Sequence, residues 1–206
     1  GVAVTAMAQP QTIHDFAGFP AALNEFHYPA RGDPQLAADV AALLAPQAVT
    51  LNADWGLDHG AWSVLTHLFP AADIPVLQLS IPTHDATTLL GLGERLRPLR
   101  EQGVLVIGSG FMTHGLQFIT RAMLEGKVPG WSADFDAWAA DALARGDVDE
   151  LAAFRDRAPG MPYAHPTVEH FTPLFITLGA ATDPTAAVTT AIDGFAIGLA
   201  KRSFHI

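Results

Sequence analysis

The sequence predicts an α/β protein with a mostly parallel central sheet, helices on both faces of that sheet and closing strands at the C-terminus. Short apolar runs such as AVTLN (48–52) and VLVIG (104–108) alternate with longer segments of helical spacing. These runs are apolar along their whole length, which is typical of strands buried on both faces of a parallel sheet. The tail over residues 187–206 alternates instead, and this pattern predicts one or two closing strands.

The first half of the chain has clear strand and helix signals. Asp33 is placed to cap a helix, and Pro34 suits its first turn, where a missing N–H costs nothing. Gly and Pro mark the TIHDFAGFP stretch as a loop. The predicted elements are, in order, a strand at 2–7, a loop at 12–20, a helix at 33–45, a strand at 48–52, an amphipathic helix at 61–69 and a strand at 74–81.

The second half becomes helical after one further strand. Pro98 predicts a kink and Gly103 the end of the first helix, while Ser132 and Asp147 are expected to cap two later helices. The last helix is expected to continue through Pro173. The predicted elements are a helix at 87–103, a strand at 104–108 and helices at 132–146, 147–158 and 166–181.

Length and composition favour one catalytic domain over residues 1–206. Half of the residues are hydrophobic and 16% are charged, as in a packed globular protein. A net charge of −10 argues against a nucleic-acid partner, and no apolar run is long enough to suggest a membrane segment. The chain has no cysteine, so a metal would be bound by His, Asp or Glu, and a cytoplasmic location is expected. The chain starts without methionine in a strand-like pattern, which suggests the interior of a longer protein.

The stretch VLVIGSGFMTHGL (104–116) places a histidine shortly after a predicted buried strand, and two familiar motifs could explain it. It lacks the third glycine of a dinucleotide-binding loop, because Thr113 stands there. It is not a nucleophile elbow either, because Ile107 stands two residues before Ser109. His114 itself is therefore the candidate functional group at the end of a predicted buried strand.

Four histidines lie in loops or helix starts rich in Gly, Asp and Pro: His14, His59, His114 and His170. Singly, each is explained better by an ordinary surface or core position. Together they suggest a site, because the loops of His59 and His114 both follow predicted strands at their carboxyl ends, where ligands of α/β sheets gather. The remaining histidines that we assign to the surface are His27, His67, His84 and His205.

Several motifs together resemble one enzyme family. DWGLDHGAWSVL, IPVLQLSI, GSGFMTHGL and PTVEHFTPLFITLGA occur in this order over nearly the whole chain. They resemble the class III extradiol ring-cleavage dioxygenases, and within them the DOPA 4,5-dioxygenase branch. The resemblance implies an enzyme that opens a catechol-type aromatic diol with dioxygen at a non-haem Fe(II), in whose site Zn(II) is also possible. The oligomeric state stays open.

The resemblance also implies roles for particular residues. His170 is expected to bind the metal, with neighbouring Glu169 as the alternative carboxylate ligand. His114 corresponds to a histidine that acts as a further ligand or as the acid/base for the catechol proton, and we favour the acid/base role. His59 corresponds to a histidine that orients the substrate or a ligand. Other residues expected to contact the substrate are His14, Asp15 and Phe111, and the aromatic residues expected to line the pocket are Phe16, Phe19, Trp55 and Phe111.

The chain departs from the family pattern in two ways. Phe111 and Gly115 replace polar residues beside the histidine of a GN-x-x-H-N-like motif, so the catechol is not identified. The family's first two metal histidines precede the point where this sequence starts, so the N-terminal ligand segment is expected to be missing. Two alternatives follow: a zinc-dependent hydrolase that uses the same histidines, or an inactive fragment that binds little metal.

Overall fold

The computed structural model describes residues 1–16 and 21–206, and these residues form two compact units, Gly1–Pro82 and Thr83–Ile206. Each unit has its own apolar core. In the first unit, Tyr28, Leu57, Trp62 and Leu65 are buried together. In the described ranges, no helix has the length and apolar character of a membrane span. The assignment of one catalytic domain to residues 1–206 stays a prediction.

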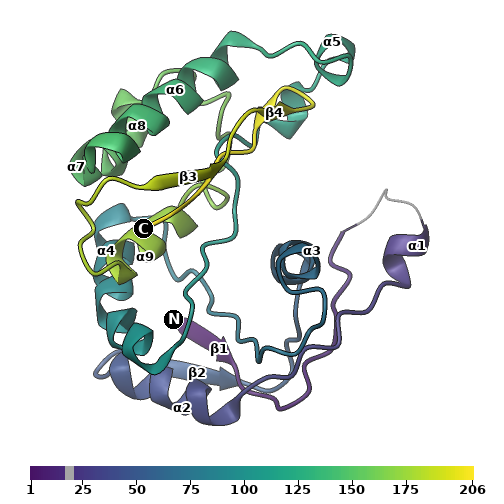
Figure 1. The fold of residues 1–206 in the computed structure, drawn as a ribbon, viewed down its shortest axis with the longest axis vertical. Coiled ribbons are helices and arrows are strands. Elements are labelled where there is room, and N and C mark those ends of the chain that lie inside the picture. Colours follow the sequence, from purple (N-terminus) through teal and green to yellow (C-terminus); the bar gives the residue numbers. More distant parts are fainter. Residues whose placement is uncertain (17–20) are drawn as a thin grey trace. The chain divides into compact units, whose positions relative to one another are not determined.

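The first unit contains a parallel pair of strands, as expected. β1 (Val2–Thr5) pairs with β2 (Val49–Asn52), and Val2 lies opposite Val49 in the register. Helix α2 (Pro34–Leu43) lies along this pair (Figure 1). The carboxylate of Asp33 accepts hydrogen bonds from the backbone N–H groups of Gln35 and Leu36, each at 3.0 Å, which confirms the predicted cap. The other helices of this unit are α1 (Ala21–Asn24) and α3 (His59–Leu68).

The strand predicted over residues 74–81 was wrong. This segment meets β1 only at an isolated bridge between Val4 and Leu79. Side chains replace part of the backbone ladder: the Ala3 N–H donates to Ser80 Oγ, and the Gln78 N–H donates to Thr5 Oγ1. These polar side chains take up the donors that a regular strand pair needs, so the ladder does not propagate.

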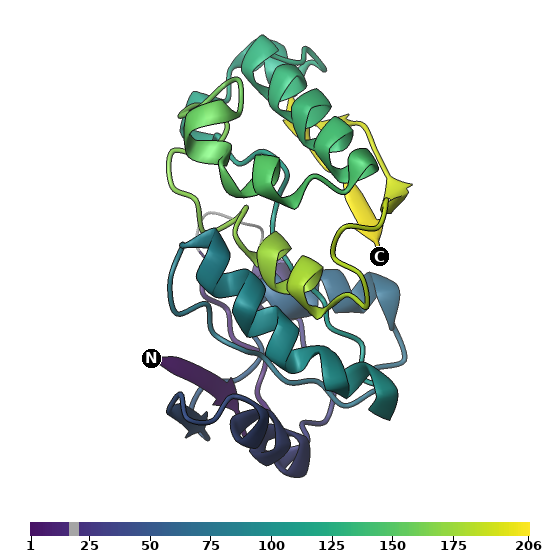
Figure 2. The ribbon, with the colours of Figure 1, turned by 90° about the vertical axis from the view of Figure 1, so that its left-hand side faces the viewer.

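Two helices of the second unit, α4 (Ala86–Leu96) and α9 (Pro173–Ala180), pack side by side (Figure 2). Their contact depends on glycine, because a Cβ on Gly93 would overlap backbone atoms of α9, and one on Gly179 would overlap the Leu90 carbonyl. The helix predicted over 87–103 changes at Arg97 into the 3₁₀ segment η1 (Arg97–Gln102), with Pro98 in its first turn. Gly103 ends it in a left-handed conformation, with φ 76°.

The other elements of the second unit surround a core of Phe135, Phe154, Phe171 and Phe175, each at most 2% exposed. Strands at the C-terminus are confirmed, but as four short ones instead of one or two: β3 (Thr189–Ile192) pairs with β6 (Ser203–His205) and β4 (Phe195–Ala196) with β5 (Leu199–Ala200), both antiparallel. The other helical elements are η2 (Leu116–Phe118), α5 (Arg121–Leu124), α6 (Gly130–Arg145), α7 (Val148–Ala152) and α8 (Phe154–Arg157).

Three local predictions for this unit were wrong. Residues 104–108 are not a strand: within the described residues no strand pairs with them, and Leu105 is 67% exposed. Ser132 does not cap α6, which begins two residues earlier, at Gly130. The last helix begins only at Pro173, because proline lacks the N–H that a helix interior needs and fits the first turn.

Candidate active site

The GSGFMTHGL segment is held along its length by the backbone around His170. The Phe111 N–H donates to the His170 carbonyl at 2.8 Å, and the His114 N–H donates to the Ala164 carbonyl at 2.7 Å. A Cβ on Gly110 would overlap that same His170 carbonyl. Close backbone approach therefore explains why glycine precedes Phe111.

His114 and His170 lie against each other as a result. Their ring centroids are 3.4 Å apart and their planes differ by 15°, so the two imidazoles are stacked. Phe111 extends the cluster, with its ring centroid 5.5 Å from that of His114. These two histidines are 56 positions apart in the chain, and the structure brings them together as one pair of nitrogen bases.

Glu169 fixes the orientation of His170. The carboxylate oxygen Oε1 lies 3.1 Å from Nδ1 of His170 and accepts a second bond, at 2.7 Å, from the Thr167 hydroxyl. Burial acts to raise the pKa of Glu169, but the bonds from Thr167 and the His170 ring outweigh it and lower this pKa. An anionic Glu169 favours the tautomer with the proton on Nδ1, which leaves Nε2 of His170 as the basic nitrogen.

His165 is a part of this region that the sequence did not single out. It is 1% exposed, and its Nε2 lies 2.9 Å from the Met112 carbonyl. Burial lowers its pKa to about 4, so the ring is neutral at physiological pH. The histidine is visible at the start of the HPTVEH segment, but a buried histidine and an exposed one look alike in a single sequence.

The first unit holds the other predicted site residues. His59 Nδ1 lies 2.9 Å from Asp15 Oδ2, and the His59 N–H donates to Asp15 Oδ1 at 3.1 Å. Partial burial acts to raise the pKa of Asp15, but these bonds from His59 outweigh it and lower this pKa. His14 contacts the Phe26 carbonyl through Nε2 at 3.0 Å.

Aromatic rings surround this loop. The ring of Phe16 lies edge-on to His59, with centroids 5.6 Å apart, and also contacts Trp62. Trp55, also expected to line a pocket, is 46% exposed. Phe19 lies outside the described residues. His59 belongs to the first unit and the stacked pair to the second, so their convergence in one site stays a prediction. The four histidines assigned to the surface, His27, His67, His84 and His205, are exposed, as predicted.

A family model described as the catalytic LigB subunit of aromatic ring-opening dioxygenase matches residues 2–195. The chain belongs to this family. The match confirms the resemblance to class III extradiol dioxygenases, and it covers both the Asp15–His59 contact and the stacked pair.

Curated relatives and a solved structure support membership of the LigB family. A "4,5-DOPA dioxygenase extradiol" from Beta vulgaris is 45% identical over 82% of this chain and 64% of its own length. An Escherichia coli K12 protein of the same name is 39% identical over 96% of this chain and 74% of its own length. The crystal structure of an uncharacterized protein from Escherichia coli K12 has a TM-score of 0.81 at 34% identity, covering 99% of this chain and 80% of that one. The predicted α/β class is thereby confirmed.

The LigB-family chain does not by itself present a complete metal site in its described part. Over residues 1–16 and 21–206, no three His, Asp or Glu side chains are grouped so that they could hold a metal ion. A metal bound by imidazole lies close to the ring plane, about 2 Å from the nitrogen. The planes of His114 and His170 are nearly parallel and 3.4 Å apart, so in this arrangement one ion cannot lie in both. Metal binding by His170 and by His114 stays a prediction.

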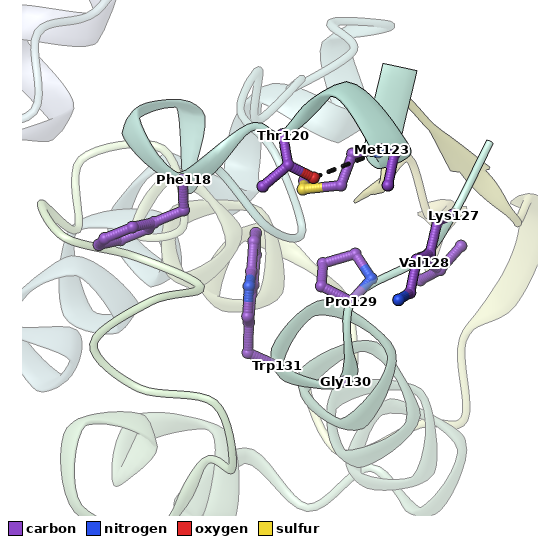
Figure 3. Close-up of a pocket in the computed structure, with 9 residues that line it drawn as sticks. Phe118, Thr120, Met123, Lys127, Val128, Pro129, Gly130 and Trp131 are labelled. Atoms are coloured by element: carbon purple, nitrogen blue, oxygen red, sulfur yellow. Dashed lines mark hydrogen bonds between the residues drawn. The ribbon is translucent and has the colours of Figure 1, made fainter. Parts of the chain in front are cut away.

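A separate cavity of about 340 Å³ lies beside α5 and α6 (Figure 3). Its wall is mainly apolar and includes Phe118, Met123, Pro129 and Trp131, while Lys127 is its one charged residue. The cavity contains no histidine or carboxylate, so it lacks the acid/base groups that the stacked pair offers. A Cβ on Gly115 would overlap the Tyr163 carbonyl and the ring of Trp131, so the wall of this cavity lies close to the residue after His114.

Proposed function

We propose that this chain provides the catalytic part of an extradiol ring-cleaving dioxygenase that opens a catechol-type diol with dioxygen. The observation that carries the proposal is the stacked pair of His114 and His170 in a chain of the LigB family. Relatives named 4,5-DOPA dioxygenase extradiol favour DOPA as the first catechol to test. A non-haem metal, expected to be Fe(II), is part of this proposal.

Within this proposal, His114 is the acid/base that accepts a proton from a hydroxyl group of the diol. Imidazole suits this role because its ordinary pKa is near neutrality. Phe111 supplies an apolar ring beside it, against which the aromatic substrate can pack. His170, held by Glu169, is the proposed metal ligand.

Residues of the first unit are proposed to bind the substrate. Asp15 holds His59 through two hydrogen bonds, which restricts the ring to one orientation. His59 and His14 are then proposed to contact the diol. An acidic, cysteine-free composition supports a cytoplasmic location for the enzyme.

The test is oxygen consumption by the full-length protein. The protein is loaded anaerobically with Fe(II), mixed with DOPA, protocatechuate, homoprotocatechuate or catechol, and exposed to oxygen. We expect oxygen uptake with at least one catechol and a yellow semialdehyde product. A sample loaded with Zn(II) is the control, because zinc does not change its oxidation state and should support no oxygen uptake. Ester or amide hydrolysis with Zn(II), without oxygen uptake in the iron sample, would identify a hydrolase instead.

A further inference from the structure

His165 is a buried histidine whose hydrogen bonding is only half satisfied. Its side chain packs against the rings of Phe135 and Phe171, with centroids 5.0 Å and 5.2 Å away. The Met112 carbonyl can only accept, so Nε2 of His165 carries the proton and donates. Nδ1 is then an unprotonated acceptor, buried and without a partner in the described part of the chain.

The unpartnered Nδ1 makes histidine a costly choice at this position. An unsatisfied buried acceptor lowers stability, and an apolar side chain between the two phenyl rings would remove it but would leave the Met112 carbonyl without its donor. What the imidazole adds is the hydrogen bond to the Met112 carbonyl. The role of His165 therefore depends on what this carbonyl does.

Met112 lies in the middle of the turn that carries His114. On one side, the Phe111 N–H is bonded to the His170 carbonyl, and on the other the His114 N–H is bonded to the Ala164 carbonyl. Thr113, fully buried, accepts from the Ala200 N–H at 2.7 Å and contacts the Ser132 hydroxyl. The bond from His165 completes this set, so each of the four residues of the turn has a bonding partner, three of them in the 164–170 segment and one at Ala200.

We propose that His165 is a positioning residue: its Nε2–H holds the Met112 carbonyl and thereby keeps His114 stacked on His170. This inference rests on the proposed function, because His165 is proposed to align His114, the proposed acid/base. Without the bond, the peptide between Met112 and Thr113 loses its carbonyl partner and is held only through the bonds of Phe111, Thr113 and His114, so the His114 ring is less firmly fixed against His170. Displacements of about 1 Å at a catalytic group can lower a rate by a factor of about 100.

The test compares three variants of the full-length protein. In His165→Gln, the side-chain amide can still reach the Met112 carbonyl. In His165→Asn it is too short to do so, and in His165→Leu the donor is absent. The control is Leu151→Val, a buried change in α7, a helix that is not among the bonding partners of the turn named above. We expect kcat to fall by about tenfold to a hundredfold in the Leu and Asn variants, with KM little changed, and to stay near wild type in the Gln variant.

Amide hydrogen exchange provides a readout that does not require turnover. Exchange at Phe111 and His114 should accelerate in His165→Leu and not in Leu151→Val, even where both variants lose similar thermal stability. Equal kcat values in all folded variants, or unchanged exchange at these two amides in His165→Leu, would overturn the positioning role. A wild-type protein that consumes no oxygen with any catechol would overturn the proposed function, while the exchange result would still decide the role of His165.

Discussion

Each unit of the protein holds a histidine beside a carboxylate, and the two pairs differ in what surrounds them. In the first unit, Asp15 lies in a loop and His59, 44 positions later, begins helix α3; half of the His59 side chain is exposed. In the second unit, His170 bonds to its neighbour Glu169, and a second imidazole lies flat against it. The first pair therefore joins a loop to the start of a helix. In the second unit, the histidine of the pair also contacts a second nitrogen base, His114, and we expect the chemistry to depend mainly on this region.

The largest effect is expected from removing one base of the stacked pair. His114→Ala should lower kcat by a factor of about 10² to 10⁴, because this is the usual contribution of a general acid/base. His59→Ala should have a smaller effect, mainly on KM. The measurement is oxygen uptake with the best catechol, and His205→Ala, an exposed histidine in β6, is the control. An equal loss of kcat in the His59 and His114 variants would contradict the expectation that the chemistry depends mainly on the second unit.

The second effect is a loss of stability at acidic pH, which we expect to arise from His165 in the second unit. Burial lowers the pKa of His165 from 6.5 to about 4, although its bond to the Met112 carbonyl acts in the opposite direction. Between these two pH values the unfolded chain binds a proton that the folded chain does not, so stability falls as the pH falls from about 6.5 to about 4. The full difference is about 3 kcal/mol. Urea unfolding at pH 7 and pH 4 should show that His165→Gln loses less stability over this range than the wild type.

Sequence reasoning predicted short-range features such as helix caps better than strands. Local signals such as Asp33 before Pro34, and Gly103 after the 3₁₀ turn, act within a few residues, so a single sequence reveals them. The predicted strands at 74–81 and 104–108 are apolar enough, but a strand also needs a partner with matching backbone donors. That requirement depends on residues far away in the chain, which apolar patterning does not report.

The candidate site shows the same limit. Motif resemblance brought His114 and His170 forward, but the stacking of their rings follows from backbone bonds between segments 50 to 60 positions apart. His165 was missed because its importance depends on burial and on one carbonyl group. The need for glycine at position 110 likewise depends on an atom far away in the chain, the His170 carbonyl oxygen.

A third prediction tests that close approach. In Gly110→Ala, the added Cβ would overlap the His170 carbonyl, so the two backbones must separate. Overpacking of this kind costs about 1–3 kcal/mol, and separation of the backbones should also disturb the stacked rings. Denaturant unfolding should therefore show a lower free energy of unfolding, and kcat should also be lower. Gly91→Ala is the matched control, because nothing lies within 4 Å of its added Cβ. Equal stability of the two variants would show that the second unit tolerates the separation.

The smallest effect is expected from the pair in the first unit. Asp15→Asn removes the charge that holds His59, but a pair this exposed contributes less than about 1 kcal/mol to stability. The pKa of Asp15 is lowered in the folded protein, so its contribution is present at neutral pH and is lost as the pH falls through that lowered pKa. Urea unfolding should therefore show a small deficit for Asp15→Asn at pH 7 that shrinks as the pH falls below the ordinary Asp pKa of 3.8 and disappears below the lowered pKa. If the variant instead loses as much kcat as His114→Ala, the first pair takes part in the chemistry, because lost stability of this size could not account for it.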